Sequence, residues 1–226
     1  MSVLQFYYDL LDIKAYIKRK YYFATKSNDG KRGFNDLTQF YVKRKSVFIA
    51  GTALLGAMVA VLDWTFKLGG LKIPFPPLPI LRFDALGVLM LLSYFLFGFL
   101  SGTITGLVAW LSISLRDPTG FSGFMKFLAE FSTIAGLYLV LRVRRQASQW
   151  WKALSMCSGI SVRVITMAVA NYLLLPIFTP SNVETVILWL PLISVFNIIQ
   201  GAVSLFGGFL LYEAVILRLP SLRIDS

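Results

Sequence analysis

The sequence predicts an all-α integral membrane protein with six transmembrane helices and both termini in the cytoplasm. Hydrophobic residues make up 57% of the 226-residue chain and charged residues 15%, whereas a soluble domain has roughly 45–50% and about 25%. The apolar residues form long blocks, which is the pattern of transmembrane helices. The Lys and Arg residues between the blocks gather on one side of the predicted membrane, and this bias orients the chain.

The apolar blocks and the turn signals between them define the six helices. Their predicted ranges are Ser46–Phe66, Asp84–Phe97, Leu100–Leu115, Gly123–Val143, Ala153–Phe178 and Glu184–Leu217. We expect an irregular loop rich in Pro and Gly over residues 68–83 and turns at 117–120 and 179–182. Asp84 begins the second helix, where a carboxylate caps the free N–H groups.

Charge divides the chain into three parts. Residues 1–45 carry ten Lys or Arg against four Asp and form a basic cytoplasmic or interfacial extension. Residues 46–217 form the six-helix membrane domain, and 218–226 form a cytoplasmic tail that, like the basic stretch 142–152, lies inside by the positive-inside rule.

The basic extension has two interpretations. A nucleic-acid-binding arm is the alternative, but a segment that lies on anionic lipid headgroups explains the same charges. We therefore expect the bilayer and no nucleic acid as its partner. Within it, an amphipathic helix is indicated by Leu4, Tyr7, Tyr8, Leu11 and Tyr16. Residues 28–33 resemble a turn and residues 35–42 a second short helix, so an interfacial helical pair is predicted.

The residue types that most enzymes and metal sites need are scarce. The chain has no His and a single Cys, Cys157, which excludes a disulfide framework, a thiolate metal cluster and His-based catalysis. No Gly-xxxx-Gly-Lys-Ser/Thr phosphate-binding loop is present. We expect no enzyme activity, no metal and no resident cofactor.

Three amide side chains lie at membrane depth. Asn197 and Gln200 are three residues apart, so they share one face of the last helix, and Asn171 lies in the preceding helix. A polar group in hydrocarbon must find a partner, and an amide offers both donors and an acceptor. The amides either line a ligand pocket or bond helices to one another.

The acidic residues of the membrane domain divide into two kinds. Glu130 lies within the fourth helix with Lys126 four residues before it on the same face. An intramembrane acid indicates a functional site, and the alternative is a Lys126–Glu130 pair near the outer boundary. Asp63 and Glu213 lie near helix ends, and we expect water to reach them.

Small residues on the first helix indicate close helix contacts. Ala53 and Ala57 are four residues apart, as are Thr52 and Gly56. Such spacing allows the backbones of two helices to approach closely. The face serves either internal packing or docking of another membrane subunit.

Several stretches together resemble a known family of membrane proteins. They are the Pro-rich stretch Lys72–Pro79, the Gly-punctuated stretch Gly98–Gly106, the stretch Ala170–Phe178, and Phe196–Gly201 followed by Leu211-Tyr212. In this order they resemble the substrate-binding S components of energy-coupling factor (ECF) vitamin transporters. The last two stretches are similar to those of riboflavin-specific S components, except that Gln200 stands where a Lys is common, Val195 replaces a Pro and Phe178 replaces a Tyr.

The resemblance implies a fold, a ligand and partners. The chain would have the six-helix S-component fold and lie in the plasma membrane of a prokaryote. It would capture riboflavin with high affinity and work with an ECF energizing module, which has two ATPases and a transmembrane coupling subunit. Ala53 and Ala57 would face that coupling subunit, and residues 68–83 would gate the site from outside. Reorientation of the whole component in the membrane would release the vitamin inside.

The resemblance and the chemistry of riboflavin together select the candidate site residues. Asn171, Asn197 and Gln200 would line the pocket, with Glu130 and Lys126 nearby. A flat ring also needs apolar walls, and the candidates are Phe75, Phe83, Tyr172 and Phe196. Two alternatives stay open, an S component for another vitamin and a non-transport membrane assembly protein.

Overall fold

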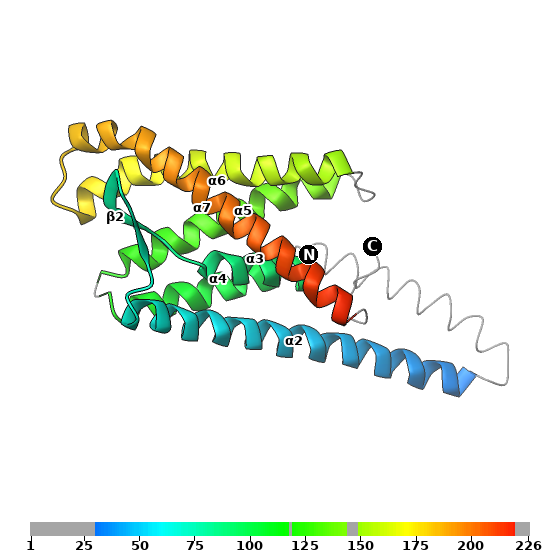
Figure 1. Ribbon diagram of the computed structural model, residues 1–226. Helices are drawn as coiled ribbons and strands as arrows, with labels where there is room; N and C mark the ends of the chain where they lie inside the picture. Colours follow the sequence, from blue (N-terminus) through cyan, green and yellow to red (C-terminus); the bar gives the residue numbers. More distant parts are fainter. Residues whose placement is uncertain (1–29, 118, 144–148, 220–226) are drawn as a thin grey trace.

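The computed structural model describes residues 30–117, 119–143 and 149–219, and within these ranges it contains six helices and one β-hairpin (Figure 1). The elements in chain order are α2 (Gly30–Leu68), β1 (Ile73–Phe75), β2 (Leu78–Phe83), α3 (Leu86–Phe97), α4 (Phe99–Ser114), α5 (Phe121–Val143), α6 (Gln149–Phe178) and α7 (Val183–Arg218). Apart from the start of α2, the helices agree with the predicted ranges to within a few residues.

Helix α2 begins well before the predicted first span. It has 39 residues, about 58 Å at 1.5 Å per residue, which is nearly twice the ~30 Å of a hydrocarbon core. The predicted separate short helix at 35–42 is therefore wrong, because α2 runs through these residues without a break. The stretch 34–50 holds neither Gly nor Pro, and extending a helix is easier than nucleating a new one. Residues 1–29, which carry the rest of the predicted extension, lie outside the described residues.

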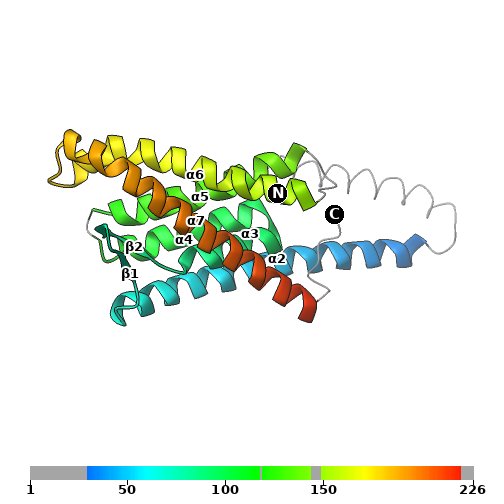
Figure 2. The same ribbon diagram turned by 45° about the horizontal axis from the view of Figure 1, so that its top comes forward.

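Four of the described helices, α2, α5, α6 and α7, are long and apolar enough to cross a membrane. Helices α3 and α4 are apolar but have only 12 and 16 residues, so the six-span topology and its orientation stay predictions. Helix α3 lies inside the bundle, where Leu86, Met90 and Leu91 are fully buried (Figure 2). A helix surrounded by other helices needs no full membrane length to bury its backbone.

The prediction of an irregular loop at 68–83 is wrong, because β1 and β2 form a hairpin there, beside the six helices of the described chain. Ile73 pairs with Phe83 and Phe75 with Leu78 in antiparallel register, and Pro76 and Pro77 form the connection. Prolines are tolerated because a two-stranded ribbon has only edge strands, which do not need every N–H. The hairpin lies at the end of the bundle where α6 turns into α7 (Figure 1).

Glycines set the closest helix approaches. A Cβ at Gly136 of α5 would lie 2.8 Å from the Gly159 Cα of α6, and one at Gly208 of α7 would lie 2.7 Å from the Leu91 Cβ of α3. Both are closer than a real Cβ tolerates. These small residues let backbones touch, as in other membrane bundles, and they bring α5 against α6 and α7 against α3.

The two small-residue faces of α2 have different surroundings. Thr52 is buried and its hydroxyl lies 2.6 Å from that of Ser101 on α4. Gly56 is also buried, against Val108. Ala53 and Ala57 are exposed. Internal packing therefore uses the Thr52–Gly56 face, and the Ala53–Ala57 face is open to lipid or to another chain.

Candidate functional site: a buried cluster of charges and amides

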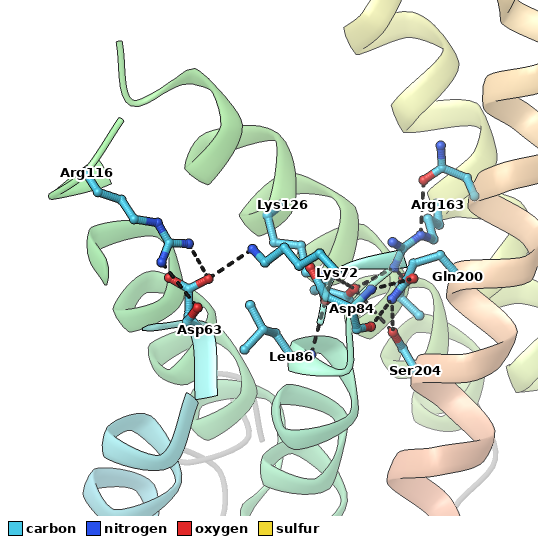
Figure 3. Close-up of polar contacts among 12 residues, drawn as sticks. Asp63, Lys72, Asp84, Leu86, Arg116, Lys126, Arg163, Gln200 and Ser204 are labelled. Carbon is cyan, nitrogen blue, oxygen red and sulfur yellow. Dashed lines mark hydrogen bonds and ion pairs between the residues drawn. The ribbon is translucent and has the colours of Figure 1, made fainter. Parts of the chain in front are cut away.

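A cluster of buried polar side chains lies between α5, α6, α7 and the start of α3 (Figure 3). Glu130 of α5 is fully buried at its centre. Its Oε1 lies 3.2 Å from Lys126 Nζ and 3.0 Å from Arg163 Nη1. It also accepts a hydrogen bond from the hydroxyl of Ser204 at 3.3 Å. The predicted Lys126–Glu130 pair is confirmed, and it belongs to a larger network.

The other carboxylate of the cluster joins it to the end of the hairpin. Asp84 directly follows β2, and its Oδ1 lies 2.7 Å from Lys126 Nζ. The same oxygen accepts from the backbone N–H of Leu86, the first residue of α3, at 3.1 Å, although the N-cap of the helix is Ala85 and not Asp84 as predicted. Two carboxylates thus face two cations, Lys126 and Arg163, and the formal charges balance. Balanced pairing offsets the desolvation of buried ions.

Gln200 of α7 forms hydrogen bonds with both backbone polar groups of Asp84. Its Nε2 donates to the Asp84 carbonyl at 2.8 Å, and its Oε1 accepts from the Asp84 N–H at 3.4 Å. Nε2 also lies 3.5 Å from the Ser204 hydroxyl. The side chain therefore holds the junction between β2 and α3 against α7.

The other two predicted amides are also buried and bonded. Asn197 donates through Nδ2 to the Ile193 carbonyl at 2.9 Å and accepts from Arg163 Nε through Oδ1 at 3.2 Å. Asn171 donates through Nδ2 to the Met167 carbonyl at 2.7 Å. The structure thus brings Asn197, Gln200, Glu130 and Lys126 into one network. Asn171 lies on α6, where its amide bonds to its own helix.

One oxygen of the network stands apart. Glu130 Oε2 is buried and has no hydrogen-bond partner among the described residues, while Oε1 receives Lys126, Arg163 and Ser204. An unpartnered buried polar atom is unfavourable by about 1–3 kcal/mol, and more for a charged group. Such an atom in a native protein calls for a specific explanation.

Gly87 lets the backbone of α3 approach this carboxylate. A Cβ at this position would lie 2.1 Å from Ser204 Oγ and 2.5 Å from Glu130 Oε1. Both distances are far too short for any side chain. The first turn of α3 is thus one wall of the cluster, and only a glycine fits there.

Three of the four aromatic side chains that were predicted to line the site contact one another at the hairpin. The ring centroids of Phe83 and Phe196 are 4.7 Å apart, and Phe75 lies 5.8 Å from the first and 5.7 Å from the second. This aromatic triad comes from β1, β2 and α7. Tyr172 does not join it, because its side chain is 44% exposed on α6.

A second charge cluster lies at the start of the hairpin. Asp63 of α2 is fully buried, so the expectation that water reaches it is wrong. Its Oδ1 lies 3.2 Å from Lys72 Nζ and 2.5 Å from Arg116 Nη2, and Oδ2 accepts from Ser112 at 3.4 Å. Arg116 also lies over the Trp64 ring. Folding of the hairpin and α4 onto α2 covers a carboxylate that the sequence places at a helix end.

Arg163 is the residue that sequence reasoning missed. It is buried on α6, and it contacts α5 through Glu130 and α7 through Asn197. The signal was present, because an Arg in the middle of the apolar block 153–178 is a functional-site indication by itself. Within the described ranges no group of three His, Cys, Asp or Glu is placed to hold a metal ion. The chemistry of the cluster is hydrogen bonding and charge pairing.

Comparisons with known proteins agree with this architecture. The family model of the ECF transporter substrate-specific component matches residues 47–212. A solved structure, described as "Structure and mechanism of the S component of a bacterial ECF transporter", is similar over 77% of this chain and 98% of that chain, with 28% identity and a TM-score of 0.63. The comparison with curated proteins finds no match.

The chain belongs to the family of substrate-specific components of ECF transporters. It is a membrane-embedded, substrate-binding component of a transporter with the S-component fold, and the family is not a known enzyme family. Membership implies a partnership with an ECF module and a location in the plasma membrane.

Proposed function

We propose that this chain binds riboflavin from outside the cell and passes it inward together with an ECF module of two ATPases and a transmembrane coupling subunit. One observation carries the choice of a flat, polar-edged ligand. The aromatic triad and the charged network are built from neighbouring residues on the same two segments, Phe83 beside Asp84 and Phe196 beside Asn197.

This adjacency matches the chemistry of a flavin. The faces of its ring are apolar, and its pyrimidine edge carries two carbonyl acceptors and one imide N–H. A site that recognises such a molecule needs mostly apolar walls and a few polar groups that fix its orientation. The triad supplies the first, and Asn197 with the unpartnered oxygen of Glu130 supplies the second. Lys126, Asn171 and Gln200 stay predicted members of the site.

Another vitamin is the second candidate, and Gln200 favours it. Gln200 already bonds the Asp84 carbonyl and N–H, so this side chain is used within the protein. Riboflavin-specific S components commonly have a Lys at this position, and its charge is missing here. If this difference changes the specificity, the substrate is a flat vitamin whose polar edge differs from that of riboflavin.

The test is ligand binding by the full chain purified in detergent. We expect riboflavin to bind with a Kd below micromolar, measured by quenching of flavin fluorescence, and to bind more tightly than thiamine or biotin. Asn197→Leu should abolish this binding while the protein still inserts and purifies. The control is Ile199→Leu, on the exposed face of the same helix. Retained affinity in Asn197→Leu would refute the site, and tighter thiamine or biotin binding would refute the ligand.

The partnership proposal rests on the exposed Ala53–Ala57 face. A large residue there blocks close approach of another helix. Ala53→Trp and Ala57→Trp should therefore keep riboflavin affinity but lose co-purification with the coupling subunit. Leu173→Trp, on the exposed side of α6, serves as the control. Normal assembly of both α2 variants would show that the coupling subunit docks elsewhere.

A further inference from the structure

The orientation of the Asn197 amide is determined by two partners of opposite kinds. Arg163 Nε can only donate, so the atom that faces it at 3.2 Å must be the amide oxygen. The Ile193 carbonyl can only accept, so the atom that faces it at 2.9 Å must be the amide nitrogen. Turning the amide over would place donor against donor and acceptor against acceptor.

Arg163 is itself held in place. Its Nη1 lies 3.0 Å from Glu130 Oε1 and 3.3 Å from the hydroxyl of Thr133. Its stem runs close to α7, where a Cβ at Gly201 would lie 3.0 Å from Arg163 Cδ. The guanidinium group is therefore fixed by α5 while its Nε holds Asn197 on α7.

The hydrogen-bonding capacity left in the network is small and specific. Asn197 has a second amide hydrogen beyond the one given to Ile193. Glu130 has an unpartnered acceptor, Oε2, within the described part of the chain. The two amide hydrogens of Gln200 lie toward the Asp84 carbonyl and the Ser204 hydroxyl. Asn197 thus offers a donor and Glu130 an acceptor, on two residues that both contact Arg163.

We infer that Arg163 is a positioning residue that determines which ligand edge the site accepts. Because Arg163 engages the amide oxygen of Asn197, the donor that this side chain offers a ligand is its second N–H, and Glu130 Oε2, on the other residue that Arg163 contacts, is the acceptor. The matching edge has a carbonyl acceptor beside an N–H, as in a cyclic amide or imide. This inference rests on the proposed function, because it assigns the edge of a flat vitamin bound at this site.

The first experiment compares riboflavin with analogues in which the 2- or 4-carbonyl oxygen is replaced by an amino group. The full-length wild type should bind the better of the two amino analogues at least about tenfold more weakly than riboflavin. A donor then faces the fixed N–H, and the ring nitrogen between the two positions loses its hydrogen and becomes an acceptor that faces Glu130 Oε2. Arg163→Lys keeps the charge for Glu130 but has no second donor fixed toward Asn197. In this variant the preference for riboflavin should fall about fivefold or more.

Arg116→Lys is the matched control, because it makes the same exchange in the other charge cluster and should leave the preference unchanged. Arg163→Met is a second variant that removes the hold on Asn197 altogether, and it should relax the preference in the same way. Full retention of the preference in Arg163→Lys would overturn the inference. So would an equal loss in Arg116→Lys.

A measurement without ligand separates this inference from the proposed function. The side-chain amide hydrogens of Asn197, assigned by NMR through their absence in Asn197→Asp, should exchange with solvent faster in Arg163→Lys than in wild type. Equal exchange rates would overturn the role of Arg163 whatever the ligand is. A wild type that ignores riboflavin but shows the expected difference in exchange would refute the proposed ligand and support Arg163 as the residue that fixes Asn197.

Discussion

The two charge clusters at the hairpin differ in how completely they are satisfied. At the start of the hairpin, both oxygens of Asp63 have partners, and Lys72 and Arg116 reach them from partly exposed positions. At the end of the hairpin, Glu130 gathers its partners on one oxygen and leaves the other unpartnered among the described residues. Figure 3 draws residues of both clusters.

Under the proposed function, this difference would separate a structural carboxylate, Asp63, from a ligand-binding one, Glu130. A fully paired carboxylate with cations at the edge of the protein holds elements together and has no capacity left. A buried carboxylate with one unpartnered oxygen keeps a position open for a donor from elsewhere. Burial alone does not distinguish the two, since Asp63 and Glu130 are equally buried.

The largest expected effect is that of Glu130→Gln on riboflavin affinity. Lys126 and Arg163 can only donate, so the amide oxygen would face them and its NH₂ group would replace Oε2. A ligand donor would then meet a donor, and affinity should fall by about 30-fold or more, which corresponds to about 2 kcal/mol. Fluorescence titration measures it. Asp63→Asn makes the same chemical exchange and should change the Kd less than threefold. An equal loss of affinity in the two variants would show that Asp63 and Glu130 do not differ in their role in binding.

Gly87→Ala comes next, because it acts on the same cluster through the backbone. The new Cβ would overlap Ser204 Oγ and Glu130 Oε1, so α3 must shift away from α5 and α7. Riboflavin affinity should fall about tenfold, within the 1–3 kcal/mol typical of overpacking. Gly56→Ala is the control, since its Cβ would meet Val108 at an ordinary 3.5 Å. Unchanged affinity in Gly87→Ala would show that α3 does not form a wall of the site.

Asp63→Asn should reduce stability while leaving binding nearly unchanged. Lys72 and Arg116 would lose their shared anion, although water reaches both cations in part. The expected loss is about 1–3 kcal/mol of unfolding free energy, seen as a lower thermal midpoint in detergent. The matched exchange Lys72→Met, which removes one of the cations, should lower the midpoint less. An unchanged midpoint in Asp63→Asn would mean that this cluster does not hold the hairpin.

The smallest effect is expected from Asp117, an acid in the turn before α5. Hydrogen bonds from the Ser122 side chain and then from Thr119 lower the pKa of Asp117 from 3.8 to about 2. A lowered folded-state pKa means that the stabilisation is complete above about pH 4 and is lost as the pH falls toward 2. Solvent screening keeps it small. Asp117→Ala should lower the thermal midpoint slightly at pH 7, and the gap from wild type should close near pH 2; a gap that widens on acidification would contradict this.

The helices of the membrane domain could be predicted because the signal is local. A stretch such as Val183–Arg218 is apolar over enough residues that it can be recognised as a helix without knowing which other helices pack against it. The Lys126–Glu130 pair was also predictable, and so was a bond from the start of α3 to Asp84, since these partners are close in the chain. The hairpin was missed because its prolines are typical of irregular loops, whereas a two-stranded ribbon tolerates them.

The sequence by itself determined the class of protein, the positions of its long helices and the presence of three amides and an acid at membrane depth, because these follow from chain-local hydrophobicity and spacing. Only the tertiary structure decided which of those polar groups face one another. It paired Arg163 with both Glu130 and Asn197, covered Asp63 with Lys72 and Arg116, and left a single oxygen of Glu130 without a partner in the described chain. The physical reason is that a buried polar group must be satisfied in space, and its partners lie on helices that are distant in the sequence.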